Sequence, residues 1–218
     1  MFGVLTTENE PALGYWLKAL FDAGRDDLML IFDRNGLSDR DVALFHERTG
    51  GQLPAIDPSA YADLPMYWVR DHNGPETHHL LKLCTAALNC GTPRILKDGT
   101  LSATHFGVIN AHPGRLPDYR GCSAVEWATH LGDKVTVTAH IMSSAIDTGD
   151  VILFHDATPG ANPIETRVNA HRACFEAMPL AIERLMSDDY QPVMTIGPDD
   201  GTYRKPFTQD SRSESPQP

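Results

Sequence analysis

The chain has 218 residues, and its 18 Lys and Arg residues against 29 Asp and Glu residues give a formal net charge of −11. A chain of this length can bury about 70% of the surface that its unfolded form exposes, so it can build a core without a disulfide or a metal. The hydrophobic content of 41% and the charged content of 22% exclude the disordered, collagen-like and coiled-coil classes. Nucleic acids are bound mainly by Lys and Arg that neutralise phosphates, so the acidic excess disfavours a nucleic-acid partner and favours a small-molecule substrate.

The cysteine usage and the apolar runs predict a cytoplasmic protein. The four cysteines lack the C-x-x-C pairs of zinc sites and the density of a secreted disulfide scaffold, which predicts reduced thiols. No basic segment followed by an apolar one opens the chain, and the longest apolar runs fall far short of the ~18 residues of a membrane span. None of the ten histidines has the neighbours of a metal-ligand set, so neither a metal nor a membrane partner is expected.

The N-terminal half alternates short apolar runs with amphipathic stretches, which is typical of a layered βαβ fold. Ser38 is placed as the N-cap of one helix, and Gly50 marks its end. The predicted strands span residues 2–5, 28–32, 67–69 and 86–88, and the predicted helices span 13–21, 38–50 and 78–83.

The C-terminal half begins with a predicted strand over residues 106–112, which Pro113-Gly114 breaks. Ser123 and Glu126 are predicted to form a capping box at the start of a helix. The elements expected from here on are a helix over 123–131, a strand over 135–142, a strand over 151–154 that pairs back as a hairpin, a helix over 164–186 and a second hairpin within 193–207. Residues 1–208 are predicted to be a single catalytic domain, followed by a disordered tail over 209–218.

Asn110 and His112 stand two apart on a predicted strand, so their side chains share one face just before the chain turns. A polar strand end that bonds to its own loop would explain both residues. Asp147 adds a second element, because it lies on a glycine-containing loop after the strand that carries His140. An Asn, a His and an Asp at two strand ends form a device for acyl transfer, with two hydrogen-bond donors for an oxyanion and a carboxylate that orients the imidazole.

The spacing of these motifs resembles the signature of the formyltransferases that use 10-formyltetrahydrofolate. The motifs that carry the resemblance are Arg94-Ile95-Leu96, Asn110-Ala111-His112-Pro113, Leu116-Pro117, Arg120-Gly121 and Asp147-Thr148-Gly149, and it is firm from about residue 87 to residue 154. The resemblance implies an α/β, Rossmann-like fold with a mostly parallel sheet, helices on both faces, and folate in a cleft at the carboxyl ends of the strands.

The resemblance also implies roles for single residues. Asn110, His112 and Asp147 match the catalytic residues of the family. The residues that it implies for binding 10-formyltetrahydrofolate are Arg94, Ile95, Leu96, His140, Ser143, Ser144, Ile146 and Asp147. For His140 two interpretations are open, an exposed strand residue or a support for Asp147. No metal is required.

The chemistry of these residues agrees with N-formyl transfer. When a neutral primary amine attacks the formyl carbon, negative charge develops on the formyl oxygen, and protonated His112 and the Asn110 amide are expected to donate to it. Asp147 favours the charged imidazole and, through water, helps to move the proton from the amine to the folate nitrogen. Three alternatives are open: an acyl-enzyme on Cys122, a 10-formyltetrahydrofolate hydrolase, and a folate-binding subunit without turnover.

Differences from the sequence patterns of the family narrow the choice of acceptor molecule. The branch that acts on glycinamide ribonucleotide cradles a phosphate on a Gly-rich turn, but here the matching stretch, residues 6–11, has two carboxylates and no glycine. The branch that acts on initiator tRNA adds a nucleic-acid-binding domain, for which neither the length nor the charge is expected to suffice. A nucleotide-linked amino sugar is therefore the predicted acceptor, and another small amine, including glycinamide ribonucleotide, is the alternative.

The residues just after the catalytic strand are the candidates for acceptor contacts. They are Pro113, Gly114, Arg115, Tyr119 and Arg120, although Arg120 could equally be a structural ion-pair residue. A nucleotide sugar carries phosphates, so an acidic chain that binds one needs a local cluster of its basic residues. The chain is expected to act on small molecules alone or as a homodimer.

Overall fold

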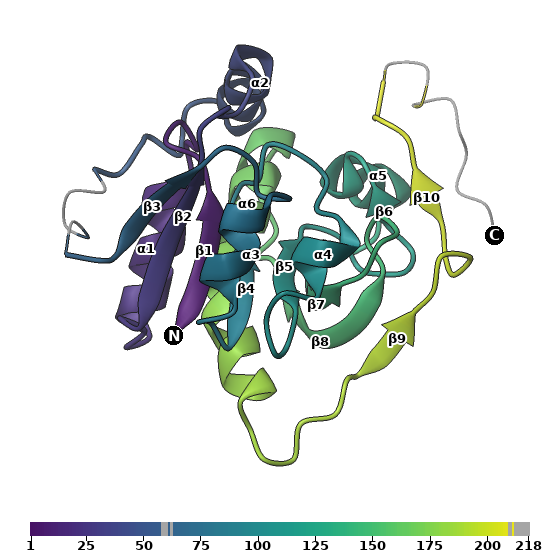
Figure 1. The fold of residues 1–218 in the computed structure, drawn as a ribbon. Coiled ribbons are helices and arrows are strands. Elements are labelled where there is room, and N and C mark those ends of the chain that lie inside the picture. Colours follow the sequence, from purple (N-terminus) through teal and green to yellow (C-terminus); the bar gives the residue numbers. More distant parts are fainter. Residues whose placement is uncertain (58–60, 62, 209–210, 212–218) are drawn as a thin grey trace.

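The computed structural model describes residues 1–57, 61, 63–208 and 211, and it shows an eight-stranded sheet with helices on both faces (Figure 1). The strands of this sheet lie in the order β3-β2-β1-β4-β5-β7-β8-β9. Their bounds are Phe2–Thr6 (β1), Leu28–Asp33 (β2), Met66–Val69 (β3), Ala86–Asn89 (β4), Val108–His112 (β5), Thr136–Met142 (β7), Gly149–Asp156 (β8) and Met194–Ile196 (β9). The strands from β3 to β5 run parallel, whereas β7, β8 and β9 are antiparallel to their neighbours. The predicted fold class, a mostly parallel α/β sheet, is confirmed.

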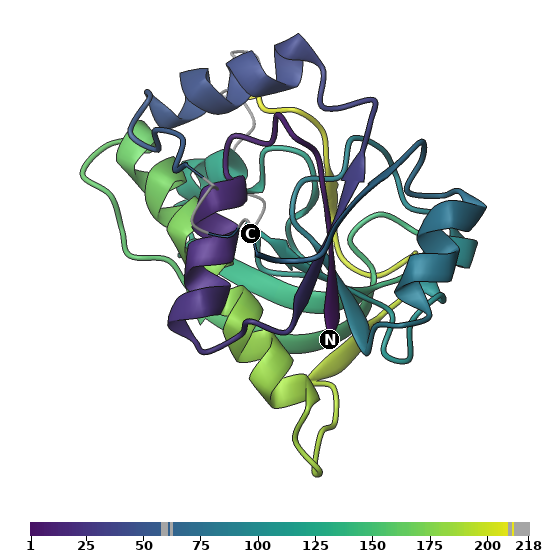
Figure 2. The same ribbon diagram turned by 60° about the vertical axis from the view of Figure 1, so that its left-hand side comes forward.

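The helices form two layers, one on each face of the sheet. They are Leu13–Asp22 (α1), Asp39–Thr49 (α2), Pro75–Leu81 (α3), Asp98–Leu101 (α4), Ala124–Leu131 (α5) and Pro163–Leu185 (α6). α6 packs on β5, β7 and β8 and contacts α1, α2 and α5, while α3 contacts α4. Figure 2 shows α1 and α6 (purple and green) on one side of the sheet and α3 (blue-green) on the other.

The sheet divides the core into two clusters. β1 and β2 are buried along their whole length, as expected of central parallel strands that are covered on both faces. The larger cluster, on the α1 and α6 side, includes Trp16, Leu17 and Phe175. The smaller cluster, on the α3 and α4 side, includes Leu81 and Leu101. The strand ends that carry the polar residues are therefore fixed from both sides.

Two helices begin and end as their sequences predict. Ser38 caps α2 by accepting a hydrogen bond from the amide of Asp41 at 3.2 Å, and Gly50 ends the helix with a φ of +55°. The side chain of Asn162 caps α6 by accepting from the Glu165 amide at 2.9 Å, with Pro163 in the first helical turn.

Two predicted features are wrong. Ser123 has a left-handed backbone (φ +55°) and its buried hydroxyl has no hydrogen-bond partner, so there is no capping box at α5. Glu126 instead forms an ion pair with Arg167 of α6, which also donates from Nε to Glu126 Oε1 at 3.2 Å. A buried cation thus takes the carboxylate away from the helix end.

The predicted hairpin within residues 193–207 is also wrong. β9 extends the main sheet beside β8, whereas Tyr203–Arg204 (β10) pairs in parallel with Arg120–Gly121 (β6) in a small second sheet. Figure 1 shows this last segment, in yellow, running along the edge of the molecule from β9 to β10. The two strands do not pair with each other because each finds a partner from an earlier part of the chain.

Smaller differences concern element bounds and the chain end. α3 begins earlier than predicted, α4 was not predicted, and β8 is longer than the predicted 151–154 strand. The single domain over residues 1–208 stays a prediction. The predicted tail lies outside the described residues except for Ser211, which is buried and whose hydroxyl accepts from the Thr208 amide. In the part of the chain that the structure describes, no helix combines the length and the apolar character that crossing a membrane requires.

The strand order reverses between β1 and β4, two neighbouring strands inside the sheet. From β1 the chain proceeds outward through β2 and β3 and then returns to place β4 on the other side of β1, beside β5. In open α/β sheets, ligands bind outside the carboxyl ends of the strands at such a switch point. The segments that follow β1, β4 and β5 meet there.

Candidate active site

Asn110 and His112 lie on β5, and β7 runs beside them with His140 directly opposite Asn110. His112 and His140 are buried, and Asn110 is half-buried. The amide nitrogen of Asn110 lies 3.2 Å from Nε2 of His140. The structure therefore brings three of the predicted polar residues into one cluster at the end of the sheet.

His140 fixes the orientation of the Asn110 amide. Burial, aided by the nearby His112, lowers the pKa of His140 to about 4, so the ring is neutral near pH 7. Nδ1 of this ring lies 3.2 Å from the carbonyl oxygen of Thr148, to which it can only donate. Nε2 is then the acceptor, and it takes one hydrogen of the Asn110 amide. The interpretation of His140 as an exposed strand residue is wrong, because it is 1% exposed.

Asn89 holds the other side of the same amide. Its Nδ2 donates to Oδ1 of Asn110 at 3.0 Å, and its Oδ1 accepts from the Thr92 amide at 3.2 Å. The oxygen of Asn110 is thus occupied, and one of its two amide hydrogens remains to donate to a ligand. Sequence reasoning missed Asn89, although a polar residue directly after the buried 86–88 strand was a signal that could have found it.

His112 lies between two acceptors. Its Nδ1 is 3.4 Å from Oδ1 of Asp147, and its Nε2 donates to the carbonyl oxygen of Tyr119 at 2.7 Å. Oδ2 of Asp147 in turn accepts from the Gly121 amide at 2.6 Å. Because a carbonyl oxygen only accepts, Nε2 of His112 carries a hydrogen, and Nδ1 faces the carboxylate of Asp147, with which the ring forms an ion pair when Nδ1 is also protonated.

Asp147 is presented by a loop that folds back over β7. Asp147 itself has a left-handed backbone (φ +53°), a conformation that Asp tolerates better than most residues. The Ser143 amide donates to the Thr148 carbonyl at 3.1 Å, and the hydroxyl of Thr148 donates to the Ala145 carbonyl at 2.7 Å. These bonds fix the carboxylate in front of His112.

The guanidinium group of Arg120 holds this loop by hydrogen bonds to its backbone. This group is buried and donates to the carbonyl oxygen of Ile146 at 3.0 and 3.2 Å, and to those of Pro198 and Asp200 at 2.7 and 2.8 Å. Of the two interpretations that the sequence left open for Arg120, the structure shows a structural contact, made to backbone carbonyls rather than in an ion pair.

The other residues predicted to contact the acceptor have different surroundings: Tyr119 and Gly114 are buried, and Arg115 is exposed. The hydroxyl of Tyr119 donates to Asp133, and burial raises the pKa of Tyr119 above its usual value. Gly114 is buried, and a Cβ there would come within 2.8 Å of Nε2 of His112. Arg115 lies over the ring of Phe154 at 4.5 Å. Tyr119 and Gly114 are buried next to His112, and the acceptor contacts of Pro113, Gly114, Arg115 and Tyr119 stay predictions.

A cavity of about 370 Å³ opens beside His140 and Asp147. We call it the donor cavity. All eight residues that the resemblance implied for folate binding line it: Arg94, Ile95, Leu96, His140, Ser143, Ser144, Ile146 and Asp147. Ile95 and Ile146 are exposed. The lining adds six residues to the predicted set: Asn89, Thr92, Pro93, Met142, Ala145 and Thr148. Apolar side chains next to backbone polar groups suit a heteroaromatic ring.

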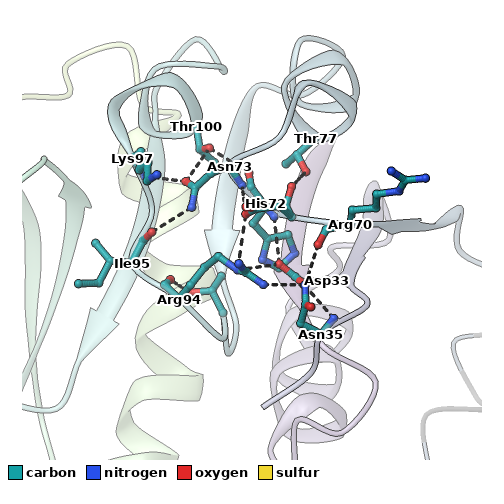
Figure 3. Close-up of polar contacts among 12 residues, drawn as sticks. Asp33, Asn35, Arg70, His72, Asn73, Thr77, Arg94, Ile95, Lys97 and Thr100 are labelled. Atoms are coloured by element: carbon teal, nitrogen blue, oxygen red, sulfur yellow. Dashed lines mark hydrogen bonds and ion pairs between the residues drawn. The ribbon is translucent and has the colours of Figure 1, made fainter. Parts of the chain in front are cut away.

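The segment 94–97 at the rim of the donor cavity is held by polar contacts with residues at the end of β2 and after β3 (Figure 3). Figure 3 shows the side chain of Arg94 directed toward Asp33, and its Nε forms an ion pair with Oδ2 of this buried residue at 3.1 Å. Burial alone would raise the pKa of Asp33, but hydrogen bonds from Asn35 and His72 outweigh it and hold the pKa below its usual value. The charged pair ties the rim to the end of β2.

Asn73 brackets the same segment. Its Nδ2 donates to the carbonyl oxygen of Ile95 at 3.0 Å, and its Oδ1 accepts from the Lys97 amide at 2.7 Å, as Figure 3 shows. Sequence reasoning missed both Asn73 and Asp33. Each acts on the rim from more than twenty residues away in the chain, and no local pattern marks such a contact.

A second cavity of about 340 Å³ lies on the other side of Asn110. We call it the acceptor cavity. Its lining includes Asn89, Asn110 and Pro113, so it meets the donor cavity at Asn89 and Thr92. Trp16, Phe45, His171 and Phe175 form an aromatic wall, and Glu10 and Asp41 supply two carboxylates. No Lys or Arg is among the described residues that line it, so the basic cluster expected for a phosphorylated acceptor is missing here.

Glu10 stands out in the acceptor cavity. It follows β1, and burial raises its pKa to about 7. Its Oε1 accepts from the Ala12 amide at 3.0 Å, while Oε2 lies so close to Gly91 that a Cβ at that position would be 2.1 Å away. The sequence had marked Glu10 only as one of two carboxylates that would repel a phosphate.

The remaining candidates lie elsewhere. The side chain of Cys122 is exposed and lines neither cavity. Among the residues that the structure describes, His, Cys, Asp and Glu nowhere gather in a group of three that could hold a metal ion.

The fold and the site define a class. A mostly parallel α/β sheet carries Asn110 at one cavity and Asp147 at a second, adjoining cavity, with His112 beside Asp147. The profile of the family described as "Formyl transferase" matches residues 51–171, and the chain belongs to this family.

Known proteins agree with this membership. A methionyl-tRNA formyltransferase of Pelotomaculum thermopropionicum is 32% identical over 143 residues, which are 63% of this chain and 43% of that protein. The chain spans less than half the length of the curated relatives of this kind that it matches.

Solved structures share the fold. A sugar N-formyltransferase from Shewanella sp. FDAARGOS_354 aligns with a TM-score of 0.62 at 12% identity, over 94% of this chain and 76% of that one. Phosphoribosylglycinamide formyltransferase from Streptococcus pneumoniae TIGR4 aligns with a TM-score of 0.59 at 18% identity, over 85% and 98%. The formyltransferase PseJ from Anoxybacillus kamchatkensis, solved with UDP-4,6-dideoxy-4-formamido-L-AltNAc and tetrahydrofolate, aligns with a TM-score of 0.57 at 14% identity, over 97% and 88%.

Proposed function

We propose that this protein transfers a formyl group from 10-formyltetrahydrofolate to a primary amine of a small acceptor. The observation that carries the proposal is Asn110, whose amide is oriented by Asn89 and His140 so that one N–H is left for a ligand. This N–H belongs to a side chain that lines the acceptor cavity, and its partner His140 lines the donor cavity. A group that passes between the two cavities passes this donor.

The donor cavity supports 10-formyltetrahydrofolate as the co-substrate. Ile95 and Ile146 offer apolar surface for a pterin ring, and the backbone of the 143–148 loop offers hydrogen-bond groups for its edge. The PseJ structure was solved with tetrahydrofolate. When bound, this co-substrate supplies the formyl carbon.

The residues of the chain divide the work of the transfer. The amine nitrogen forms a bond to the formyl carbon as the bond from that carbon to the folate nitrogen breaks, and the N–H of Asn110 donates to the oxygen on which charge develops. One such donor is worth roughly 10² to 10³ in rate. When His112 is protonated, its positive ring stabilises the same charge, although in the structure its Nε2 donates to Tyr119 and its Nδ1 faces Asp147.

Asp147 transfers the proton from the attacking amine to the departing folate nitrogen. Its carboxylate, held by the Gly121 amide, keeps His112 in place and, through water, receives the proton that the amine loses and passes it to the departing folate nitrogen. General acid–base assistance of this kind contributes typically 10²- to 10⁴-fold.

The sequence favours a nucleotide-linked amino sugar as the acceptor, and structural neighbours named as sugar N-formyltransferases support the sugar class. Neighbours named as phosphoribosylglycinamide formyltransferases are equally similar in fold. The two carboxylates of the acceptor cavity disfavour a phosphate inside it. Any phosphate of the acceptor would therefore remain outside this cavity. We expect the protein to work in the cytoplasm, on small molecules.

The experiment is a screen of nucleotide-linked 3- and 4-amino sugars, glycinamide ribonucleotide and unphosphorylated amines with 10-formyltetrahydrofolate, in which folate release is followed by absorbance. At least one amine should release tetrahydrofolate in step with formamide formation. Formate release without any amine would replace the transferase by a hydrolase. Folate binding with no release in any reaction would replace it by a binding subunit.

A further inference from the structure

We infer that the acceptor cavity is built to receive a positively charged group, with Glu10 as the residue that recognises it, so that the acceptor is a small amine that carries a second cationic group and no phosphate in this cavity. This inference rests on the proposed function, because it names the acceptor class of the same site. It assigns to Glu10 a specificity role beside the transfer centre.

The position of Glu10 supports this role. Glu10 follows β1, Gly91 follows β4 and Asn110 lies on β5, and these three strands are neighbours in the sheet. All three residues line the acceptor cavity. The backbone of Gly91 has a φ of +96°, and the space where a Cβ would stand is filled by Oε2 of Glu10. The glycine thus leaves room for a carboxylate next to the centre that performs the transfer.

The titratable groups around Glu10 leave its charge uncompensated. Burial raises the pKa of Cys174 to about 12 and that of Cys90 well above its usual value, and burial lowers the pKa of His171 to about 3, so all three are neutral near pH 7. Asp41, from the first turn of α2, adds a second carboxylate at the lining.

The two arginines that influence His171, a neighbour in the lining, do not line the cavity themselves. Arg167 of α6, whose charge helps to lower the pKa of His171, forms an ion pair with Glu126 of α5. The charge of Arg48 of α2 also helps to lower the pKa of His171, but Arg48 does not line the cavity. A carboxylate that is half-buried without a cation is satisfied by a ligand that brings one.

The aromatic wall completes the match. Trp16, Phe45 and Phe175 present ring surface to the cavity, and ring faces attract cations and cover alkyl chains. A phosphate would meet only like charge from Glu10 and Asp41. A short diamine, with one amine directed to Asn110 and the other to Glu10, uses every feature of this lining.

The test measures binding of 1,4-diaminobutane to the full chain by isothermal titration calorimetry, with and without tetrahydrofolate. The wild-type chain should bind the diamine, and Glu10→Gln should weaken the affinity at least tenfold. Glu8→Gln is the matched control, because Glu8 lies on the same loop, is exposed and only accepts from Trp68. Inorganic phosphate should not bind in either case.

Two further measurements keep the result interpretable if Glu10→Gln folds poorly. Gly91→Ala should weaken diamine binding as well, since its Cβ displaces the carboxylate without removing its charge. Affinity of the wild type should rise from about pH 6 to about pH 8 as Glu10 loses its proton, and the affinity of Glu10→Gln should stay constant. Equal affinity of wild type and Glu10→Gln, or no binding at millimolar diamine, would overturn the inference.

The outcome is separable from that of the proposed function. A chain that binds the diamine in a Glu10-dependent way but formylates no amine keeps this site and removes the proposed transfer. A chain that formylates a nucleotide-linked amino sugar with the same kcat/KM in wild type and Glu10→Gln keeps the transfer and removes this site.

Discussion

The two cavities that meet at Asn89 and Thr92 are held in different ways. The rim of the donor cavity is fixed through its backbone, by Asn73 and the Arg94–Asp33 pair on one side and by Arg120 on the other. The acceptor cavity is walled by side chains from α1, α2, α6 and the segment after β1. A backbone rim suits one invariable co-substrate, whereas a wall of side chains can be altered by single substitutions. Under the proposed function, the donor cavity would define the reaction and the acceptor cavity would select the amine.

The largest effect is expected on the donor side, at Asp147. Asp147→Asn retains an oxygen for the Gly121 amide but removes the charge that faces His112, so turnover should fall on the order of 10² to 10⁴. Stopped-flow or steady-state folate release would measure it, with Asp150→Asn on the neighbouring strand as the control. If turnover changed by less than threefold while the fold stayed intact, the carboxylate would have no part in the proton transfer.

The second prediction tests whether the anchor behind the donor rim is energetically significant. Asp33→Ala leaves Arg94 with only Asp71 and removes the acceptor of the Asn35 and His72 amides, and each lost hydrogen bond costs about 1 kcal/mol. Urea unfolding should show this loss, and tetrahydrofolate affinity should weaken because the 94–97 rim is freed. Asp26→Ala, on an exposed loop, should change neither quantity. Unchanged folate affinity in Asp33→Ala would show that the rim does not depend on this anchor.

The third prediction concerns a wall of the acceptor cavity. Burial lowers the pKa of His171 to about 3, so below its unfolded pKa the unfolded chain binds a proton that the folded chain does not, and stability falls with falling pH. Between pH 7 and pH 5, His171→Gln should lose about 2 kcal/mol less stability than the wild type. Urea unfolding at the two pH values measures this difference. The exposed His79→Gln should behave like the wild type, and a His171→Gln slope equal to the wild-type slope would show that His171 is not buried neutral.

The smallest effect is expected where the cavities meet. Asn89→Leu removes the hydrogen bond to Oδ1 of Asn110, a loss of about 1 kcal/mol, so kcat should fall by roughly three- to tenfold with little change in KM for the folate. Asn169→Leu, which removes an exposed hydrogen bond to the Thr158 carbonyl and changes no residue that lines either cavity, is the control. A change in KM alone would mean that Asn89 shapes the cavity and does not orient the amide.

The sequence predicts the donor side better than the acceptor side. Asn110, His112 and Asp147 and the rim 94–96 lie within one stretch of the chain, where their spacing can be read from local motifs. Glu10 and His171 stand far apart in the sequence and meet only because α6 returns over the sheet beside the segment that follows β1. Their environment, and with it the raised pKa of Glu10, exists only in the folded chain.

The wrong predictions have the same origin. The S-x-x-E pattern at Ser123 favours a capping box locally, but Arg167, more than forty residues later, offers the Glu126 carboxylate a buried ion pair instead. The 193–207 segment looks like a hairpin by itself, and it separates because β8 and β6 each present an open edge. Tertiary partners decided both cases, and neither partner is visible in the local pattern.

The most direct test of the account is formyl transfer by Asn110→Ala compared with the wild type, with 10-formyltetrahydrofolate carrying a ¹³C-labelled formyl group and the labelled formamide detected by mass spectrometry. The account predicts that turnover falls by roughly 10² to 10³ while tetrahydrofolate affinity stays within twofold of the wild type, because Asn110 acts on the transition-state oxygen and does not line the donor cavity. Wild-type turnover in Asn110→Ala would contradict it.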